Sequence, residues 1–119
     1  VIRGEKGQRI EFRIGSADAN PYLVAAATIG AGLIGIRDKI ELPPPLTGNA
    51  YDQQEHLPAS LQLPGSLKEA AVEFAASPVA REIFGDEFVD HYAATRDWEV
   101  REYERHVNDW QLKRYFEII

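Results

Sequence analysis

The sequence predicts an α+β segment that is mostly helical and carries one β-strand, over about residues 9–14. Residues 9–14 alternate between charged and apolar side chains, which is the period of a strand. From residue 66 onward, helix-capping residues and apolar side chains three or four positions apart predict consecutive helices. The 119 residues, 45% hydrophobic and 27% charged, suffice for one domain and do not indicate disorder.

The predicted strand has two unlike faces, because successive side chains of a strand point to opposite sides. One face carries Ile10, Phe12 and Ile14. The other carries Arg9, Glu11 and Arg13. A carboxylate between two guanidinium groups is suited to holding a metal ion while the arginines bind phosphate. A solvated strand face with an internal ion pair is the alternative, and the residues alone leave both open.

A turn over residues 15–20 follows the strand and leads into a helix from Tyr22 to about Asp38. Asn20 can cap the free amides of that helix, and Pro21 suits its first position. The helix is apolar all round, so we expect it to be buried against something other than the remaining segments. Its three glycines weaken a helix and predict close packing: Gly30, Gly32 and Gly35.

Five prolines exclude regular helix from most of residues 40–64, which we interpret as one long ordered loop. Three helices are predicted after it, opened by a capping box at Ser66, by Ser77-Pro78, and by Asp86 as a cap. The last is the longest and presents one apolar stripe: Val89, Tyr92, Val100, Tyr103, Val107 and Trp110. The tail, residues 112–119, is apolar enough that we expect it to dock.

The net charge of −6 argues against a nucleic-acid-binding surface, which needs a basic face. The absence of cysteine fits a reducing cytoplasm, and no signal peptide or membrane span is present. The chain contains no methionine and opens at Val1 almost directly before its charged strand. We therefore expect it to be the later part of a longer polypeptide.

Several motifs in order resemble the carboxy-terminal part of the catalytic domain of glutamine synthetases. They are Arg9-Ile10-Glu11-Phe12-Arg13, Ala19-Asn20-Pro21-Tyr22-Leu23, Ala31-Gly32-Leu33-Ile34-Gly35-Ile36, Asn49-Ala50-Tyr51-Asp52, Leu63-Pro64-Gly65-Ser66-Leu67 and Asp109-Trp110-Gln111-Leu112-Lys113-Arg114-Tyr115-Phe116. The resemblance implies one segment, 1–119, of a cytoplasmic ligase of nitrogen metabolism that joins ammonia to glutamate through γ-glutamyl phosphate. It further implies ATP and Mg²⁺ or Mn²⁺ as cofactors, and ring-shaped homo-oligomers.

By that resemblance, Glu11 is similar to the carboxylate that binds the metal bridging the nucleotide phosphates. Arg9 matches an arginine that contacts ATP phosphate, and Lys6, in the loop over residues 1–8, falls where a lysine does the same. Arg13 matches the arginine that binds the glutamate carboxylate and steadies the transferred phosphoryl group in catalysis. Phosphoryl transfer depends on positioning and charge neutralisation, which such a face supplies.

The chain departs from the family in two ways. The other metal carboxylates, the metal-binding histidine, the ammonium-site residues and the amino-terminal domain have no counterpart, so the chain alone is expected to be inactive. Residues 15–18 replace the Phe-Pro-Asp-Pro of many glutamine synthetases and look closer to the branch with γ-glutamyl-polyamine ligases. Two alternatives therefore stay open: a γ-glutamyl-amine ligase, and a non-catalytic helical assembly module.

Overall fold

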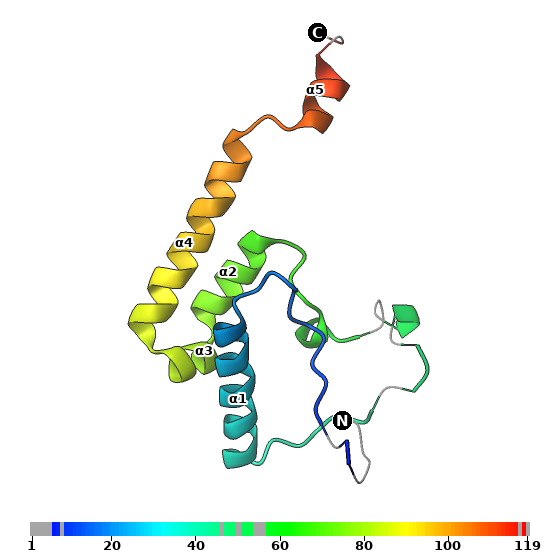
Figure 1. The fold of residues 1–119 in the computed structure, drawn as a ribbon, viewed down its shortest axis with the longest axis vertical. Helices are drawn as coiled ribbons and strands as arrows, with labels where there is room; N and C mark the ends of the chain where they lie inside the picture. Colours follow the sequence, from blue (N-terminus) through cyan, green and yellow to red (C-terminus); the bar gives the residue numbers. More distant parts are fainter. Residues whose placement is uncertain are drawn as a thin grey trace. The chain divides into compact units, whose positions relative to one another are not determined.

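A computed structural model describes residues 6–7, 9–45, 47–49, 51–53, 57–116 and 118 (Figure 1). The chain divides into two compact units, Val1–Ile40 and Glu41–Ile119. Its described part is mostly helical, with α1 (Pro21–Arg37), α2 (Leu67–Ala76), α3 (Pro78–Phe84), α4 (Asp86–Arg105) and α5 (Asp109–Tyr115). Between residues 40 and 64 it has no α-helix, only short 3-10 turns at 51–53 and η2 (Ala59–Leu61), as the prolines predicted.

The strand predicted over about residues 9–14 is wrong for the described chain. Arg9 forms a single β-bridge, and residues 10–14 have no regular secondary structure. An extended segment becomes a strand only when a neighbouring backbone pairs with its N–H and C=O groups. No described segment forms a ladder with residues 10–14, so the alternating side chains lie on an extended but unpaired backbone.

Helix α1 begins as the sequence predicted. The Asn20 Oδ1 atom accepts hydrogen bonds from the backbone N–H of Tyr22 (2.9 Å) and Leu23 (3.4 Å), and Pro21 is the first helical residue. None of the α1 residues is buried, however, and Ile36 is 77% exposed. We expected the cover of this apolar helix to come from outside the remaining segments, and the described residues supply none.

The close packing predicted for the α1 glycines is not seen at two of them, Gly32 and Gly35. A Cβ atom built on Gly32 or Gly35 would meet no atom within 4 Å. Both positions thus have room for a side chain, and the cost of glycine to the helix is not offset by a contact there.

The unit Glu41–Ile119 is built on α2, α3 and α4, which pack against one another. The Ser66 Oγ atom accepts from the Glu69 backbone N–H (3.2 Å), while the Glu69 carboxylate accepts from the Gly65 N–H (2.8 Å). At the next corner, the Ser77 Oγ atom accepts from the Ala80 N–H (3.1 Å). These side chains satisfy amides that the first turns leave free, as the capping patterns predicted.

A small core joins the three helices. Each contributes one buried aliphatic residue: Ala71, Ala80 and Val89. Beside them stands a cluster of half-buried aromatic rings: Phe74, Phe84, Phe88 and Tyr92. The rings of Phe84 and Phe88 lie 5.2 Å apart, and those of Phe88 and Tyr92 lie 5.6 Å apart, at centroid spacings at which ring pairs attract.

Helix α4 differs from its prediction at both ends. Asp86 is its first residue rather than its cap, because Gly85 precedes it with φ of 81° and the Asp86 carboxylate pairs with Arg81. The helix ends at Arg105, because His106 has an extended backbone with ψ of 134°. The predicted stripe is therefore interrupted, and its last member, Trp110, belongs to the separate helix α5.

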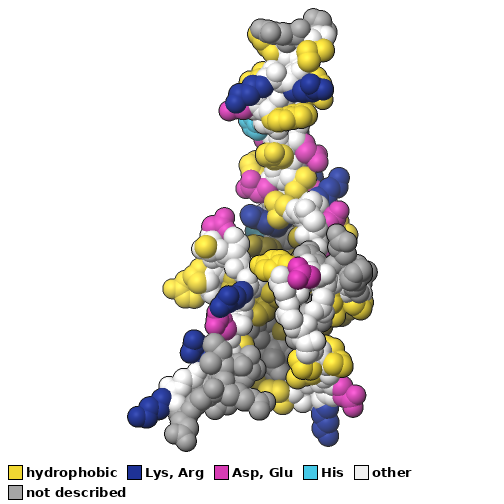
Figure 2. All heavy atoms as spheres, turned by 90° about the vertical axis from the view of Figure 1, so that its right-hand side faces the viewer, with side chains coloured by type: hydrophobic (Ala, Val, Ile, Leu, Met, Phe, Trp, Pro, Cys, Tyr) yellow, Lys and Arg dark blue, Asp and Glu magenta, His cyan; other side chains and the backbone are white. Residues whose placement is uncertain are grey.

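The docking that we expected for the tail is not seen for its described residues, 112–116 and 118. Helix α5 contacts no other described helix, Trp110 is 64% exposed and Phe116 is 80% exposed. Figure 2 shows hydrophobic side chains, in yellow, on the outer surface among charged ones. Across the described residues, no helix combines the length and apolar character that a bilayer crossing requires.

Candidate functional site

The candidate site lies on the extended segment that precedes α1. Phe12 and Ile14, from its apolar side, line a hollow of about 380 Å³ together with Val24 and neighbouring α1 residues. The Cβ position of Gly15 would lie 3.6 Å from the Val24 side chain, which shows how closely the segment approaches the helix. The alternating apolar and charged side chains therefore define two sides of an extended segment, and the apolar side faces α1.

The two charged residues Glu11 and Arg13 are brought together on the other side. The Arg13 Nε atom donates to Glu11 Oε1 at 2.5 Å, and the Arg13 Nη2 atom also contacts Oε1. The Arg13 side chain is 83% exposed, whereas that of Glu11 is 37% exposed. This is the internal ion pair that the sequence allowed, and it couples the proposed metal ligand to the proposed substrate-binding cation.

The two other candidate cations make no described contact with this pair. The Arg9 Nη1 atom donates to the carbonyl of Gly7 at 3.4 Å, and Lys6 lies exposed in the turn with Gly7. Both head groups are therefore accessible to an anion. Residues 1–5 and 8 of the predicted loop lie outside the described residues.

A compact turn fixes the segment to the start of α1. The Ser16 Oγ atom donates to Asp18 Oδ1 at 2.5 Å, and the backbone N–H of Ala19 donates to the carbonyl of Ser16 at 3.1 Å. The hydrogen bond from Ser16 holds the pKa of the Asp18 carboxyl below its ordinary value. Asn20 then caps the helix, so residues 15–20 are structural and Ser16 is paired as a turn residue.

Glu11 can supply one oxygen ligand to a metal ion. Within the part of the chain that the structure describes, no group of three or more acidic, histidine or cysteine residues could hold such an ion. Mg²⁺ is commonly held by one or two carboxylates together with substrate phosphates, and it retains several waters. A single carboxylate flanked by exposed cations suits one wall of a site for a metal-bound polyphosphate.

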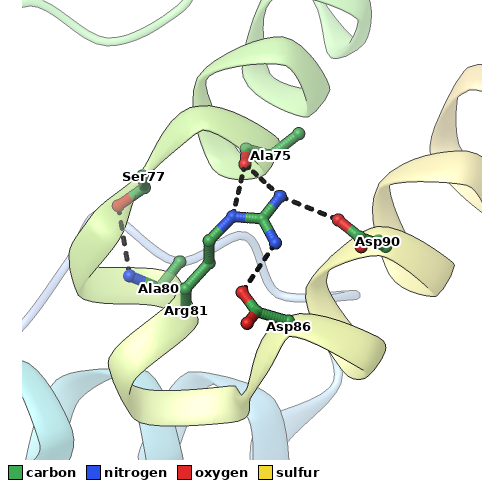
Figure 3. A network of polar contacts seen from close by, with 6 residues as sticks. All are labelled: Ala75, Ser77, Ala80, Arg81, Asp86 and Asp90. Atoms are coloured by element: carbon green, nitrogen blue, oxygen red, sulfur yellow. Dashed lines mark hydrogen bonds and ion pairs between the residues drawn. The ribbon is translucent and has the colours of Figure 1, made fainter.

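Sequence reasoning missed a polar network centred on Arg81 of α3 (Figure 3). The Arg81 Nε and Nη2 atoms donate to the carbonyl of Ala75, at 3.0 and 2.7 Å. Nη1 donates to Asp86 (2.8 Å) and Nη2 also to Asp90 (2.7 Å), and these carboxylates raise the pKa of Arg81. The network ties the end of α2 to the start of α4 and serves the fold. Carboxylates five and nine residues after an arginine were its only signal in the sequence.

A second hollow, of about 540 Å³, lies between the start of α2 and the later half of α4. Leu67, Val100 and Tyr103 form its apolar part, with Lys68, Glu99 and Glu104 around them. Ser66 also lines the hollow, but its Oγ atom caps α2 by accepting from the Glu69 N–H, and no described hydrogen bond joins it to Lys68, Glu99 or Glu104.

Comparisons with a family model and with individual proteins point to the same family. Residues 1–115 match the family model described as "Glutamine synthetase, catalytic domain". The chain is 43% identical over 120 residues to type-1 glutamine synthetase 2 of Dictyostelium discoideum, covering 100% of this chain and 23% of that protein. It is 47% identical over 111 residues to a glutamate–isopropylamine ligase of a Pseudomonas species, covering 93% of this chain and 24% of that protein.

A third relative is a γ-glutamylethanolamide synthetase of Streptomyces coelicolor, 38% identical over 117 residues, which cover 98% of this chain and 24% of that protein. The chain thus spans about a quarter of the length of these curated relatives. No solved structure matches it.

Proposed function

The chain belongs to the glutamine synthetase family, and on that premise we propose that it is the carboxy-terminal segment of the catalytic domain of an ATP-dependent ligase. The ligase joins the side-chain carboxyl of glutamate to ammonia through γ-glutamyl phosphate. The observation that carries the proposal is the charged face around the pair of Glu11 and Arg13, on a segment within the matched region.

Each charge on this face has a task in the proposed reaction. Arg9 and Lys6 bind phosphate oxygens of ATP, for which their exposed head groups suffice. Arg13 binds the glutamate carboxylate and neutralises charge on the transferred phosphoryl group, as its planar fork allows. Glu11 would hold a divalent metal, Mg²⁺ or Mn²⁺, which when bound neutralises the nucleotide phosphates.

The same proposal includes an incomplete site. Glu11 is one carboxylate, and the described residues offer no cluster that could complete a metal site. The remaining metal ligands and the ammonium site would come from other parts of a longer protein that forms ring-shaped homo-oligomers. The proposal places this protein in the cytoplasm, as expected from the sequence. The 119-residue chain by itself should then be inactive.

The test is made in the complete ligase. Glu11→Gln should abolish metal-dependent phosphate release from ATP while leaving the size of the oligomer unchanged. Glu41→Gln, which removes an exposed carboxylate outside this face, should leave turnover unchanged. Normal turnover of Glu11→Gln would remove Glu11 from the site. Robust γ-glutamyl transfer by the isolated chain would contradict the incomplete site.

A second candidate is a γ-glutamyl-amine ligase. Two relatives favour it by their names: one is a glutamate–isopropylamine ligase and the other a γ-glutamylethanolamide synthetase. Residues 15–18, which depart from the Phe-Pro-Asp-Pro pattern, favour it as well. Phosphate release measured with ammonium, isopropylamine, ethanolamine and a polyamine separates the two. Failure of the complete protein to bind ATP and Mg²⁺ in calorimetry would instead favour a non-catalytic assembly module.

A further inference from the structure

The ion pair between Glu11 and Arg13 uses one of the two carboxylate oxygens and two of the three guanidinium nitrogens. Both contacts of Arg13, through Nε and Nη2, end on Oε1 of Glu11. Among the described residues, no hydrogen bond or ion pair involves Oε2 of Glu11 or Nη1 of Arg13. The pair therefore joins two groups and leaves each with one polar atom free for a further partner.

Such an arrangement restricts the carboxylate. A glutamate side chain on an extended segment has several rotamers, and ordering it costs conformational entropy. Two nitrogens of a planar guanidinium group on one oxygen fix the position of that oxygen and so restrict the rotamers of the side chain. Carboxylates that bind metals are usually themselves hydrogen-bonded, and loss of such a partner weakens metal binding.

We propose that Arg13 is a positioning residue for Glu11, holding Oε1 so that Oε2 is presented to the metal. The inference rests on the proposed function, because it takes Glu11 as the metal ligand. It adds to the substrate-binding task of Arg13, since Nη1 remains available to an anion while the other nitrogens hold Glu11.

The proposal gives Arg13 an effect on metal binding with a definite sign. If Arg13 served only the substrate, its removal would leave metal affinity unchanged without substrate, or raise it, because a nearby positive charge would be gone. If Arg13 orients Glu11, its removal lowers that affinity. The loss of a partner to a metal ligand typically costs about 10–100-fold in affinity.

The experiment titrates Mn²⁺ into the complete ligase without ATP, glutamate or amine, and measures free Mn²⁺ by electron paramagnetic resonance. Glu11→Gln identifies the binding step that depends on Glu11. Arg13→Gln should weaken that step about tenfold or more, and Arg13→Lys should weaken it less, because one ammonium group can still reach Oε1. Lys39→Gln is the control, since it removes an exposed cation from the same compact unit, outside the charged face.

Weaker binding in Arg13→Gln with unchanged binding in Lys39→Gln supports the proposal, provided that the metal-free variants keep the wild-type melting temperature and oligomer size. Unchanged or tighter binding in Arg13→Gln overturns it while leaving Glu11 as a ligand. An equal loss in Lys39→Gln also overturns it, because the effect would then not depend on the contact between Arg13 and Glu11. If Glu11→Gln binds Mn²⁺ normally, the metal role in the proposed function fails as well.

Discussion

Replacing Val89 by alanine tests whether the small core at the meeting of α2, α3 and α4 holds this unit together. Val89 is 0% exposed and lies on α4, which packs against both other helices. The substitution removes about two methyl equivalents at about 0.8 kcal/mol each, and the remaining cavity adds to that loss. We therefore expect the free energy of unfolding to fall by about 2 kcal/mol, which for a unit of this size lowers the melting temperature by roughly 8–16 °C.

The assay is thermal unfolding of the 119-residue chain followed by circular dichroism at the helix band. Val72→Ala is the matched control, because it makes the same chemical change on α2 at a side chain that is 64% exposed. Its expected effect is within about 0.5 kcal/mol, as for most surface substitutions. Equal shifts for the two variants would refute the assignment of the core to Val89.

Three further predictions concern contacts outside the core. Arg81→Lys should lower the melting temperature, because one ammonium group cannot replace four contacts to Ala75, Asp86 and Asp90; a melting curve like that of the wild type would contradict this. The pKa of Asp18 should lie below its ordinary 3.8 and rise in Ser16→Ala, as followed by carbon NMR of the carboxyl group. Because the pKa of Asp18 is lowered in the folded chain, its carboxylate stabilises the fold at pH values above 3.8. This contribution is lost as the pH falls below 3.8 and through the lowered pKa. Gly85→Ala should cost about 1–3 kcal/mol in urea unfolding, because φ of 81° with ψ of 155° suits glycine alone; no loss would show that the corner relaxes.

Local sequence rules predicted the helices well, because their causes are local. Asn20, Ser66 and Ser77 each accept hydrogen bonds from amides two or three residues later, so their side chains define helix starts without help from the rest of the fold. The same rule misplaced the cap of α4. There Asp86 is drawn to Arg81, and a glycine with positive φ makes the corner instead.

Features that depend on distant partners were less predictable. The alternation over residues 9–14 gives the two sides of the segment correctly, but a strand also needs a paired backbone, which the pattern cannot supply. The pair of Glu11 and Arg13 was foreseeable from their spacing of two residues. That both nitrogens converge on one oxygen was not, because rotamers decide it.

The break between α4 and α5 gives the chain two separate optical reporters. Its two tryptophans, Trp98 and Trp110, lie on either side of residues 106–108 and are 52% and 64% exposed. An indole that moves from water into an apolar environment shifts its fluorescence to shorter wavelength. Trp98→Phe leaves emission from α5 alone, and Trp110→Phe leaves emission from α4 alone. Intrinsic fluorescence can therefore report, helix by helix, when either surface becomes covered.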